Sequence, residues 1–327
     1  RYHPPTGGAV SKRVSLSTVL LMVILCALLV VVVLSRSNRV EVEANDLGLS
    51  ALRAPSRAFP VPGDAQIVDP RPTRRFDVPA TPGPPRNVVL IIGDGMGLGH
   101  LSVISALIHG PAGGMAMESA PVVGLVRTWA ANDLVTGSAA SASAMATGRK
   151  TDRKVVSMQP DGSEPPTLFE IAAARGLSTG FVTTSGLVDA TPAGFLTHVP
   201  SRYDYRLILE QMLESRADVL IGGDFTSHKR ASLKLGYLEL ARSLETEAPE
   251  RWTVIRDPGQ LEGKSAPLIA LFAPRSGHRY AHGPELARSA AVAMGLLAQN
   301  PSGFLLVLEC EETDEGAHAN DLDRIVK

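Results

Sequence analysis

The stretch that decides the fold runs Val88-Val89-Leu90-Ile91-Ile92-Gly93-Asp94-Gly95-Met96-Gly97. Its first five residues form a continuous apolar run of strand length, which is typical of a strand buried on both faces. The glycines around Asp94 permit a tight turn and the close approach of a ligand, so the carboxylate is available to a cation. A plain turn from strand to helix explains the same residues, and both interpretations stay open here.

Outward from this run, further strand-like segments alternate with helical patterns. The strand candidates are 180–184, 218–221, 252–255, 267–272 and 303–308, and the helix candidates are 167–175, 206–216, 234–246 and 285–299. This alternation predicts an α/β fold whose mainly parallel central sheet carries helices on both faces. We expect this globular domain to span residues 87–327.

The overall composition excludes one class of partner. With 327 residues and 44% hydrophobic content, the chain can bury a sizeable core. Its formal net charge is only -1, and its basic residues are scattered, so nothing indicates nucleic acid as a partner. Cys26 lies inside an apolar span and is not expected to pair with Cys310, so no disulfide is predicted.

The apolar span at residues 16–34 carries no charge and is long enough to cross a bilayer as a helix. We interpret it as an uncleaved transmembrane signal anchor behind a tail at 1–15, because the run exceeds the usual signal-peptide core and no Ala-x-Ala site follows closely. A cleaved signal peptide is the alternative. Basic residues lie on both sides of the span, so the positive-inside rule favours a cytoplasmic N-terminus only modestly. The remaining chain is therefore expected to be extracytoplasmic, in the periplasm or outside the cell.

Residues 35–86 join the anchor to the globular domain. This segment is rich in proline and has little apolar periodicity, which predicts an extended linker or stalk.

The second informative stretch is Val135-Thr136-Gly137-Ser138-Ala139-Ala140-Ser141-Ala142-Ser143-Ala144. We expect Gly137 to allow a tight turn, and the Ala/Ser run after it to form a helix whose first amide groups could receive an anion. Ser138 is then a candidate nucleophile at the start of that helix. Small-residue helices are also common where two elements pack closely, which is the alternative.

Polar residues follow two other predicted strands, where sites form in open α/β sheets. After 180–184 comes Asp189-Ala190-Thr191-Pro192-Ala193, in which Thr191 either caps a helix that starts at Pro192 or offers a hydroxyl ligand. Further on, Arg202 is either a guanidinium fork for a phosphate or a solvated surface residue.

The predicted strand 303–308 leads into an acidic segment, residues 309–321. We expect most of these carboxylates to form a solvated face. Asp314 and His318 are four residues apart, which places them on one side of a helical turn, and their oxygen and nitrogen donors suit zinc.

Together these motifs resemble the alkaline phosphatase family from about residue 87 to the end of the chain. The residues that carry the resemblance are Asp94-Gly95-Met96-Gly97, Thr136-Gly137-Ser138-Ala139-Ala140-Ser141, Ala146-Thr147-Gly148, Asp189-Ala190-Thr191-Pro192-Ala193, His198-Val199, Arg202, Glu309, Asp314 and His318-Ala319-Asn320. All of them occur in the family's order.

The resemblance implies hydrolysis of phosphate monoesters through a phosphoserine on Ser138, with Arg202 holding the substrate phosphate. It also implies two zinc ions and one magnesium ion. Asp94 would bridge a zinc site and the magnesium site, and Asp189 would lie just outside the magnesium ligands. The other implied ligands are Thr191 and Glu309 for magnesium, and Asp314 and His318 for the second zinc. The resemblance leaves open whether the protein forms a homodimer.

The sequence departs from the family's pattern at two places. The family commonly has an acidic residue where Gly137 stands, and that carboxylate would orient Arg202. The family's remaining zinc ligands, an Asp-His pair and a later histidine, would lie beyond Lys327. We therefore expect the catalytic domain to be incomplete at its C-terminus, and residues 1–327 alone to be inactive or poorly folded unless more sequence follows.

Two other functions remain as alternatives at this stage. One is a related phosphodiesterase or sulfatase of the same superfamily, although the sequence lacks a Cys/Ser-x-Pro-x-Arg sulfatase signature. The other is a truncated or degenerate homologue that binds metal or phosphate without turnover.

Overall fold

The computed structural model describes residues 85–110, 113–223, 244, 250–272 and 283–326. The expected tail at 1–15, the anchor at 16–34, nearly all of the linker at 35–86 and most of the predicted helix 234–246 lie outside the described residues. Within the described part, no helix has both the length and the apolar character needed to span a membrane.

A six-stranded sheet organises the domain, and every pair of neighbouring strands is parallel. Its strand order is β1 (Asn87–Gly93), β6 (Phe304–Cys310), β2 (Ser178–Gly186), β3 (Val219–Gly223), β5 (Leu268–Phe272) and β4 (Thr253–Ile255). The prediction of a mainly parallel sheet is confirmed. Because all strands run the same way, their carboxyl ends meet at one edge of the sheet.

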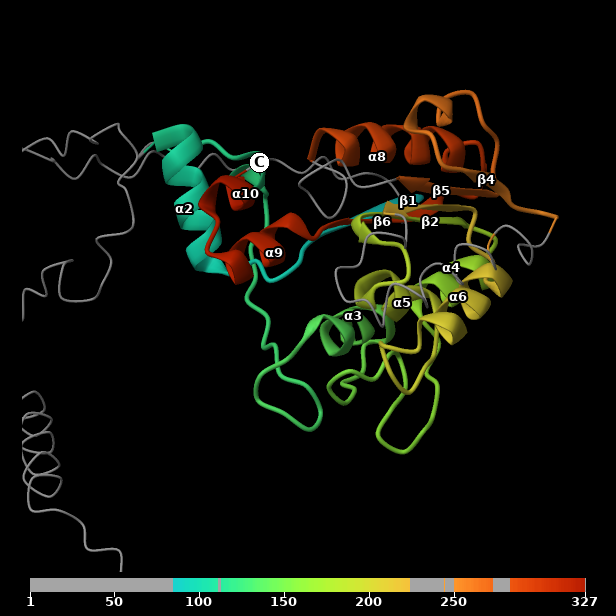
Figure 1. Cartoon of the computed structure of the whole chain (residues 1–327), viewed down its shortest axis with the longest axis horizontal. Coiled ribbons are helices and arrows are strands. Elements are labelled where there is room, and N and C mark those ends of the chain that lie inside the picture. The colour runs from blue at the N-terminus through green and yellow to red at the C-terminus, as the bar shows by residue number, and fades with distance from the viewer. Residues whose placement is uncertain (1–84, 111–112, 224–243, 245–249, 273–282, 327) are drawn as a thin grey trace, which may run out of the picture. The chain divides into compact units, whose positions relative to one another are not determined.

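Helices cover both faces of this sheet, as Figure 1 shows. One face carries α3 (Ser138–Thr147), α4 (Leu168–Ala174), α5 (Ala190–Leu196) and α6 (Tyr205–Glu214), and the other carries α8 (Gly283–Leu297). Beyond the carboxyl ends of β1 and β6 lie α2 (Leu98–His109), α9 (Glu312–Ala319) and α10 (Leu322–Val326). Two short 3-10 turns, Ala116–Ser119 and Pro258–Gln260, complete the described elements.

The core divides into two layers, one on each face of the sheet. Successive residues of a strand point to opposite faces, so Phe181 of β2 enters one layer and Val182 enters the other. Phe181 packs against Phe169 and Phe195, with ring centroids 6.3 and 5.7 Å away. Helices α4 and α5 are thereby held against the centre of the sheet.

Strand β1 differs from the sequence-based expectation. We expected it to be buried on both faces, but Val88, Val89 and Ile91 are 44%, 42% and 71% exposed. Among the described strands, β1 lies at the edge of the sheet and pairs with β6 alone. An apolar run indicates which residues favour burial, but it does not determine whether the strand lies in the centre or at the edge of the sheet.

Candidate active site

The candidate site is built where β1, β6 and β2 end. Ile92 of β1 and Thr183 of β2 both stand opposite Glu309 of β6 in the sheet register. The Asp94 N–H donates to the Cys310 carbonyl at 3.0 Å, which extends the pairing of β1 and β6 by one residue. The strand ends therefore place the carboxylates of Asp94 and Glu309 in one region.

Ser138 is the first residue of α3, as the sequence predicts. Its Oγ donates a hydrogen bond of 2.9 Å to Oδ2 of Asp94, which precedes it by 44 residues. The first amide groups of a helix have no partner within the helix, so this end of α3 suits an anion. A hydroxyl, a carboxylate and free helix amides thus converge at one point.

The expectation of a tight turn at Gly137 is wrong. Gly137 is the N-cap of α3 with φ −146° and ψ 166°, an extended conformation that any residue adopts. A Cβ at this position would meet no atom within 4 Å. The backbone here does not require glycine, and there is room for a side chain.

Arg202 forms an ion pair with Asp189, in which the guanidinium Nη2 donates to Oδ1 at 2.5 Å. The other partners of Asp189 are the Ala190 N–H at 2.7 Å and the Ser185 hydroxyl at 2.9 Å. Burial alone would raise the pKa of Asp189, but the charge of Arg202 and these hydrogen bonds hold it below its usual range. The expectation that Asp189 lies just outside the magnesium ligands stays a prediction, and the structure adds its ion pair with Arg202.

The start of α5 also differs from the expectation. The helix begins at Ala190 with Asp189 as its N-cap, so Thr191 and Pro192 occupy the second and third helical positions. Proline is accepted there because amides of the first turn have no helical partner. Thr191 is therefore not the cap. Its buried side chain instead lies close enough to Glu309 to help to lower the pKa of that carboxyl.

Glu309 is a buried carboxylate, only 1% exposed. Its Oε2 accepts a hydrogen bond of 2.7 Å from the Thr183 hydroxyl, while its Oε1 is buried and has no partner of hydrogen-bond geometry among the described residues. Burial and the negative charges of Asp94 and Asp189 raise its pKa to about 8, although the nearby hydroxyls of Thr191 and Thr183 act to lower it. A carboxylate in this environment favours a bound cation.

Glu311 is a site residue that we did not predict. We expected it to belong to a solvated acidic face, but Glu311 is only 9% exposed and Glu312 only 5%. Burial and the nearby charges of Asp189, Glu309 and Asp94 raise the pKa of Glu311 well above its usual range. The signal was present, because Glu311 directly follows β6, and sites in open α/β sheets form beyond the carboxyl ends of the strands. Glu312 is neutralised differently, by Arg324.

Asp314 and His318 lie together on α9, as their spacing predicts. His318 Nε2 is 3.5 Å from Asp314 Oδ2, and the side chain of His318 is 79% exposed. Asp314 packs against the turn after β1, where Gly95 has a φ of +63° and a Cβ would come within 2.4 Å of Asp314 Oδ1. Glycine is therefore required at this turn. Burial and the charge of Asp94 raise the pKa of Asp314.

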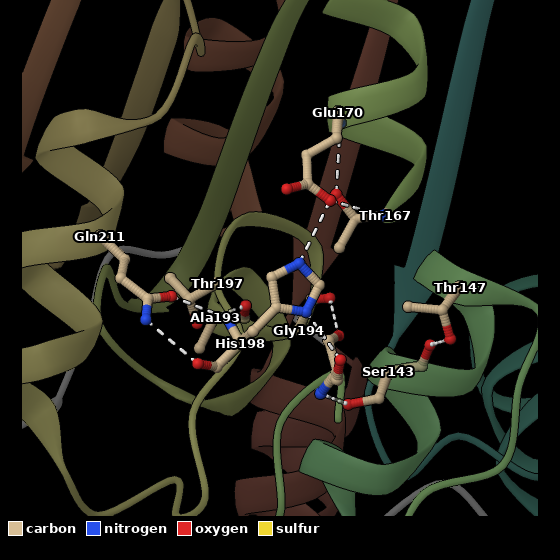
Figure 2. A network of polar contacts seen from close by, with 10 residues as sticks. Ser143, Thr147, Thr167, Glu170, Ala193, Gly194, Thr197, His198 and Gln211 are labelled. Atoms are coloured by element: carbon tan, nitrogen blue, oxygen red, sulfur yellow. Dashed lines mark hydrogen bonds and ion pairs between the residues drawn. The ribbon is translucent and has the colours of Figure 1, made fainter. Parts of the chain in front are cut away.

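A polar network ties together the helices that carry the site (Figure 2). The Ser157 N–H donates to Ser143 Oγ of α3 at 2.7 Å, and the Ser157 hydroxyl donates to the Gly194 carbonyl of α5 at 2.5 Å. His198 follows α5 and is held by Ser157, Glu170 and Gln211, with contacts of 2.7 to 3.2 Å. The network fixes α3, α5 and the segment before Arg202 relative to one another.

Three carboxylates meet the requirements of a cation site. Asp94, Glu309 and Glu311 each offer a ligand oxygen, and these atoms lie within 4.8 Å of one another. Glu309 also has a buried oxygen, Oε1, without a hydrogen-bond partner among the described residues. Oxygen-only donors fit magnesium or a similar hard cation. Asp314 and His318 offer a separate mixed pair that suits zinc.

A cavity of about 430 Å³ lies elsewhere, beside the polar network. It is lined by Phe169, Glu170, Ala173, Ala174, Thr179, Phe195, Leu196, His198, Gln211, Glu214, Ser215, Arg216 and Ala217. Thr179 belongs to the first part of β2, whereas the carboxylates gather where the strands end. This cavity is therefore separate from the candidate active site.

Comparison with known proteins agrees with this geometry. The family model for alkaline phosphatase matches residues 85–327. Streptomycin-6-phosphate phosphatase of Streptomyces griseus is 32% identical, over 73% of this chain and 66% of that protein. Alkaline phosphatase of Escherichia coli K12 is 29% identical, over 82% of this chain and 69% of the relative. The chain thus spans about two thirds of the length of these relatives.

Solved structures show the same fold. The cold-active alkaline phosphatase of Shewanella sp. superposes with a TM-score of 0.62 at 28% identity, over 73% of this chain and 61% of that one. A variant of the enzyme from the Antarctic bacterium TAB5, described with Mg bound in its M3 site, gives 0.59 at 27% identity, over 74% and 69%. Fold, motifs and site geometry lead to the same conclusion: the chain belongs to the alkaline phosphatase family.

Proposed function

We propose that this protein hydrolyses phosphate monoesters by transferring the phosphoryl group to Ser138. The hydrogen bond from Ser138 Oγ to Asp94 Oδ2, 2.9 Å long at the start of α3, is the observation that carries the proposal. Oγ attacks phosphorus, the ester P–O bond breaks, and the alcohol leaves. Water then attacks the phosphoserine, releasing phosphate and regenerating the hydroxyl.

Arg202 and the start of α3 are the groups that would hold the phosphate. The guanidinium is kept in place by Asp189 at 2.5 Å, and a guanidinium matches two phosphate oxygens as a fork. The free amide groups of the first helical turn add donors beside Ser138. These donors would hold the negatively charged phosphate of the substrate next to Ser138 Oγ.

The donor set supports metal assistance, for which we propose two zinc ions and one magnesium ion. Thr191 and Glu309 would be magnesium ligands, and Asp94 would be a ligand of both magnesium and one zinc. Asp314 and His318 would be ligands of the other zinc. When bound, such cations lower the pKa of a serine hydroxyl and stabilise the entering and leaving oxygens. Asp94 orients Oγ through their hydrogen bond, and Thr183 and Thr191 orient Glu309.

The test is hydrolysis of p-nitrophenyl phosphate at alkaline pH with added zinc and magnesium, using the protein at its natural length. We expect Ser138→Ala to lower kcat by more than about 10³-fold, because it removes the nucleophile. Intact mass after an acid quench should show one added phosphoryl group on the wild type. Ser141→Ala is the matched control. It removes a hydroxyl from the same helix, but that hydroxyl is hydrogen-bonded to the Thr136 hydroxyl at 2.9 Å and is not the proposed nucleophile. Turnover that survives Ser138→Ala overturns the proposal.

We also propose that residues 16–34 anchor the protein, with the catalytic domain outside the cytoplasm. The uncharged apolar span supports this arrangement. Protease added to spheroplasts, which keep the cytoplasmic membrane intact, should digest the catalytic domain, and carbonate washing should leave the protein in the membrane fraction. Protection of the domain in spheroplasts would contradict the proposed orientation.

A further inference from the structure

The strongest feature not explained by the family's motifs is Glu311. Its carboxylate lies with those of Asp94 and Glu309, and the ligand oxygens of the three groups are within 4.8 Å of one another. Glu309 and Glu311 are both buried. Three acidic groups this close repel one another strongly at low dielectric unless protons or a cation neutralise them.

The backbone fixes Glu311 in this position. Its N–H donates to Thr184 Oγ1 of β2 at 2.9 Å. One residue earlier, the Cys310 carbonyl accepts from the Asp94 N–H at 3.0 Å. Glu311 is therefore held between the ends of β1 and β2, and its place beside Asp94 follows from the sheet.

The neighbouring acids are neutralised by arginines, whereas Glu311 is not. Asp189 is paired with Arg202, and Glu312 with Arg324. Among the described residues, Glu311 has no ion pair with a lysine, arginine or histidine. A second observation points to a ligand: Glu309, a member of the same cluster, has a buried Oε1 with no hydrogen-bond partner among the described residues.

We propose that Glu311 is a third carboxylate ligand of the cation held by Asp94 and Glu309, and that it adapts this site to hard divalent cations such as Mg²⁺ or Mn²⁺. The inference rests on the metal assistance in the proposed function. Three carboxylates with the Thr191 hydroxyl make an oxygen-only donor set, which these cations prefer to the nitrogen and sulfur donors favoured by zinc. The added negative charge increases affinity for a divalent cation.

The experiment measures cation binding directly, by titration calorimetry with Mg²⁺ and by the loss of free Mn²⁺ in electron paramagnetic resonance, on metal-free protein. Glu311→Gln keeps the shape of the side chain and removes its charge. We expect the dissociation constants of both cations to rise by about ten-fold or more. Glu312→Gln is the matched control, because it makes the same change at the next residue, which is also buried but faces Arg324. It should leave both constants unchanged.

The outcomes separate this inference from the proposed function. Ser138→Ala should abolish turnover and keep Mn²⁺ binding, which supports the two proposals independently. Wild-type affinity in Glu311→Gln overturns the inference, and so does an equal loss of affinity in Glu312→Gln. A wild-type protein that binds neither cation also overturns it, whatever its turnover. Circular dichroism confirms that each variant is folded before its affinity is compared.

Discussion

Gly137 stands directly before the proposed nucleophile, in an extended conformation with open space around its Cα. An aspartate fits there without backbone strain and would add a carboxylate that can restrain Arg202. Because Asp189 already holds Arg202, we expect Gly137→Asp to tighten phosphate inhibition only about two- to five-fold, the range of a partly exposed ion pair. Gly137→Asn is the control for the size of the side chain. Unchanged inhibition by phosphate in Gly137→Asp would show that a carboxylate at position 137 does not restrain Arg202.

Glu170 gives the protein a pH dependence that does not involve the candidate metal ligands. Burial raises the pKa of Glu170, but the Thr167 N–H, at 2.7 Å, and His198 hold it below its usual range. The folded state therefore favours the carboxylate, and this contribution is complete above the unfolded pKa and lost as the pH falls through the folded value.

The variant Glu170→Gln keeps the hydrogen-bonding shape and does not titrate. We expect the wild type to melt at a higher temperature than Glu170→Gln at pH 7, and this difference to shrink as the pH falls from 5 to 3. Calorimetric melting curves at several pH values measure it. A difference that stays constant over this range would show that the carboxylate charge is not involved.

At the scale of elements, the contact between α3 and α5 positions the site. A Cβ on Gly194 of α5 would lie 2.7 Å from the Cβ of Ala142 and 3.1 Å from two backbone atoms of α3. Gly194→Ala must push the helices apart, so we expect a loss of about 1–3 kcal/mol in the free energy of unfolding. Turnover should fall as well, because α3 carries Ser138 and α5 carries Thr191.

The control for this substitution is Gly295→Ala in α8, where a Cβ would meet no atom within 4 Å. Alanine favours a helix interior over glycine by up to about 1 kcal/mol, so this variant should be as stable as the wild type or more so. Urea denaturation followed by circular dichroism compares the two. Equal stability of Gly194→Ala and Gly295→Ala would show that α3 and α5 tolerate a wider spacing.

At the scale of the whole molecule, stability should depend on the cation. The carboxylates of Asp94, Glu309 and Glu311 come from two segments more than two hundred residues apart, the turn after β1 and the end of β6, and one bound ion would hold these segments together. A cation at 100 times its dissociation constant stabilises the folded state by about 2.7 kcal/mol. We expect Mg²⁺ to raise the melting temperature, EDTA to lower it, and Glu309→Gln to remove most of the response. The same melting temperature in EDTA and in Mg²⁺ would rule out this coupling.

Local sequence predicted the elements and much of the site. Apolar runs predicted all six described strands, β1 to β6, within about two residues, and helical spacing predicted α4, α6 and α8 equally closely. Ser138 was expected at the start of a helix, where the structure has it. The predicted start of α5 and the predicted turn at Gly137 were wrong, because several capping arrangements fit the same few residues and only neighbouring contacts select one. The zinc ligands expected beyond Lys327 and the membrane anchor stay predictions.

By itself the sequence determined the parallel α/β fold and the polar residues that follow each strand, because alternating apolar runs and strand-end motifs are local properties. Only the tertiary structure decided which of those residues meet. The register of β1, β6 and β2 brings Glu311 beside Asp94 and Glu309, and the network around Ser157 and His198 sets the helices. Burial and partner identity depend on contacts between segments that lie from about forty to more than two hundred residues apart, which no short stretch of sequence contains.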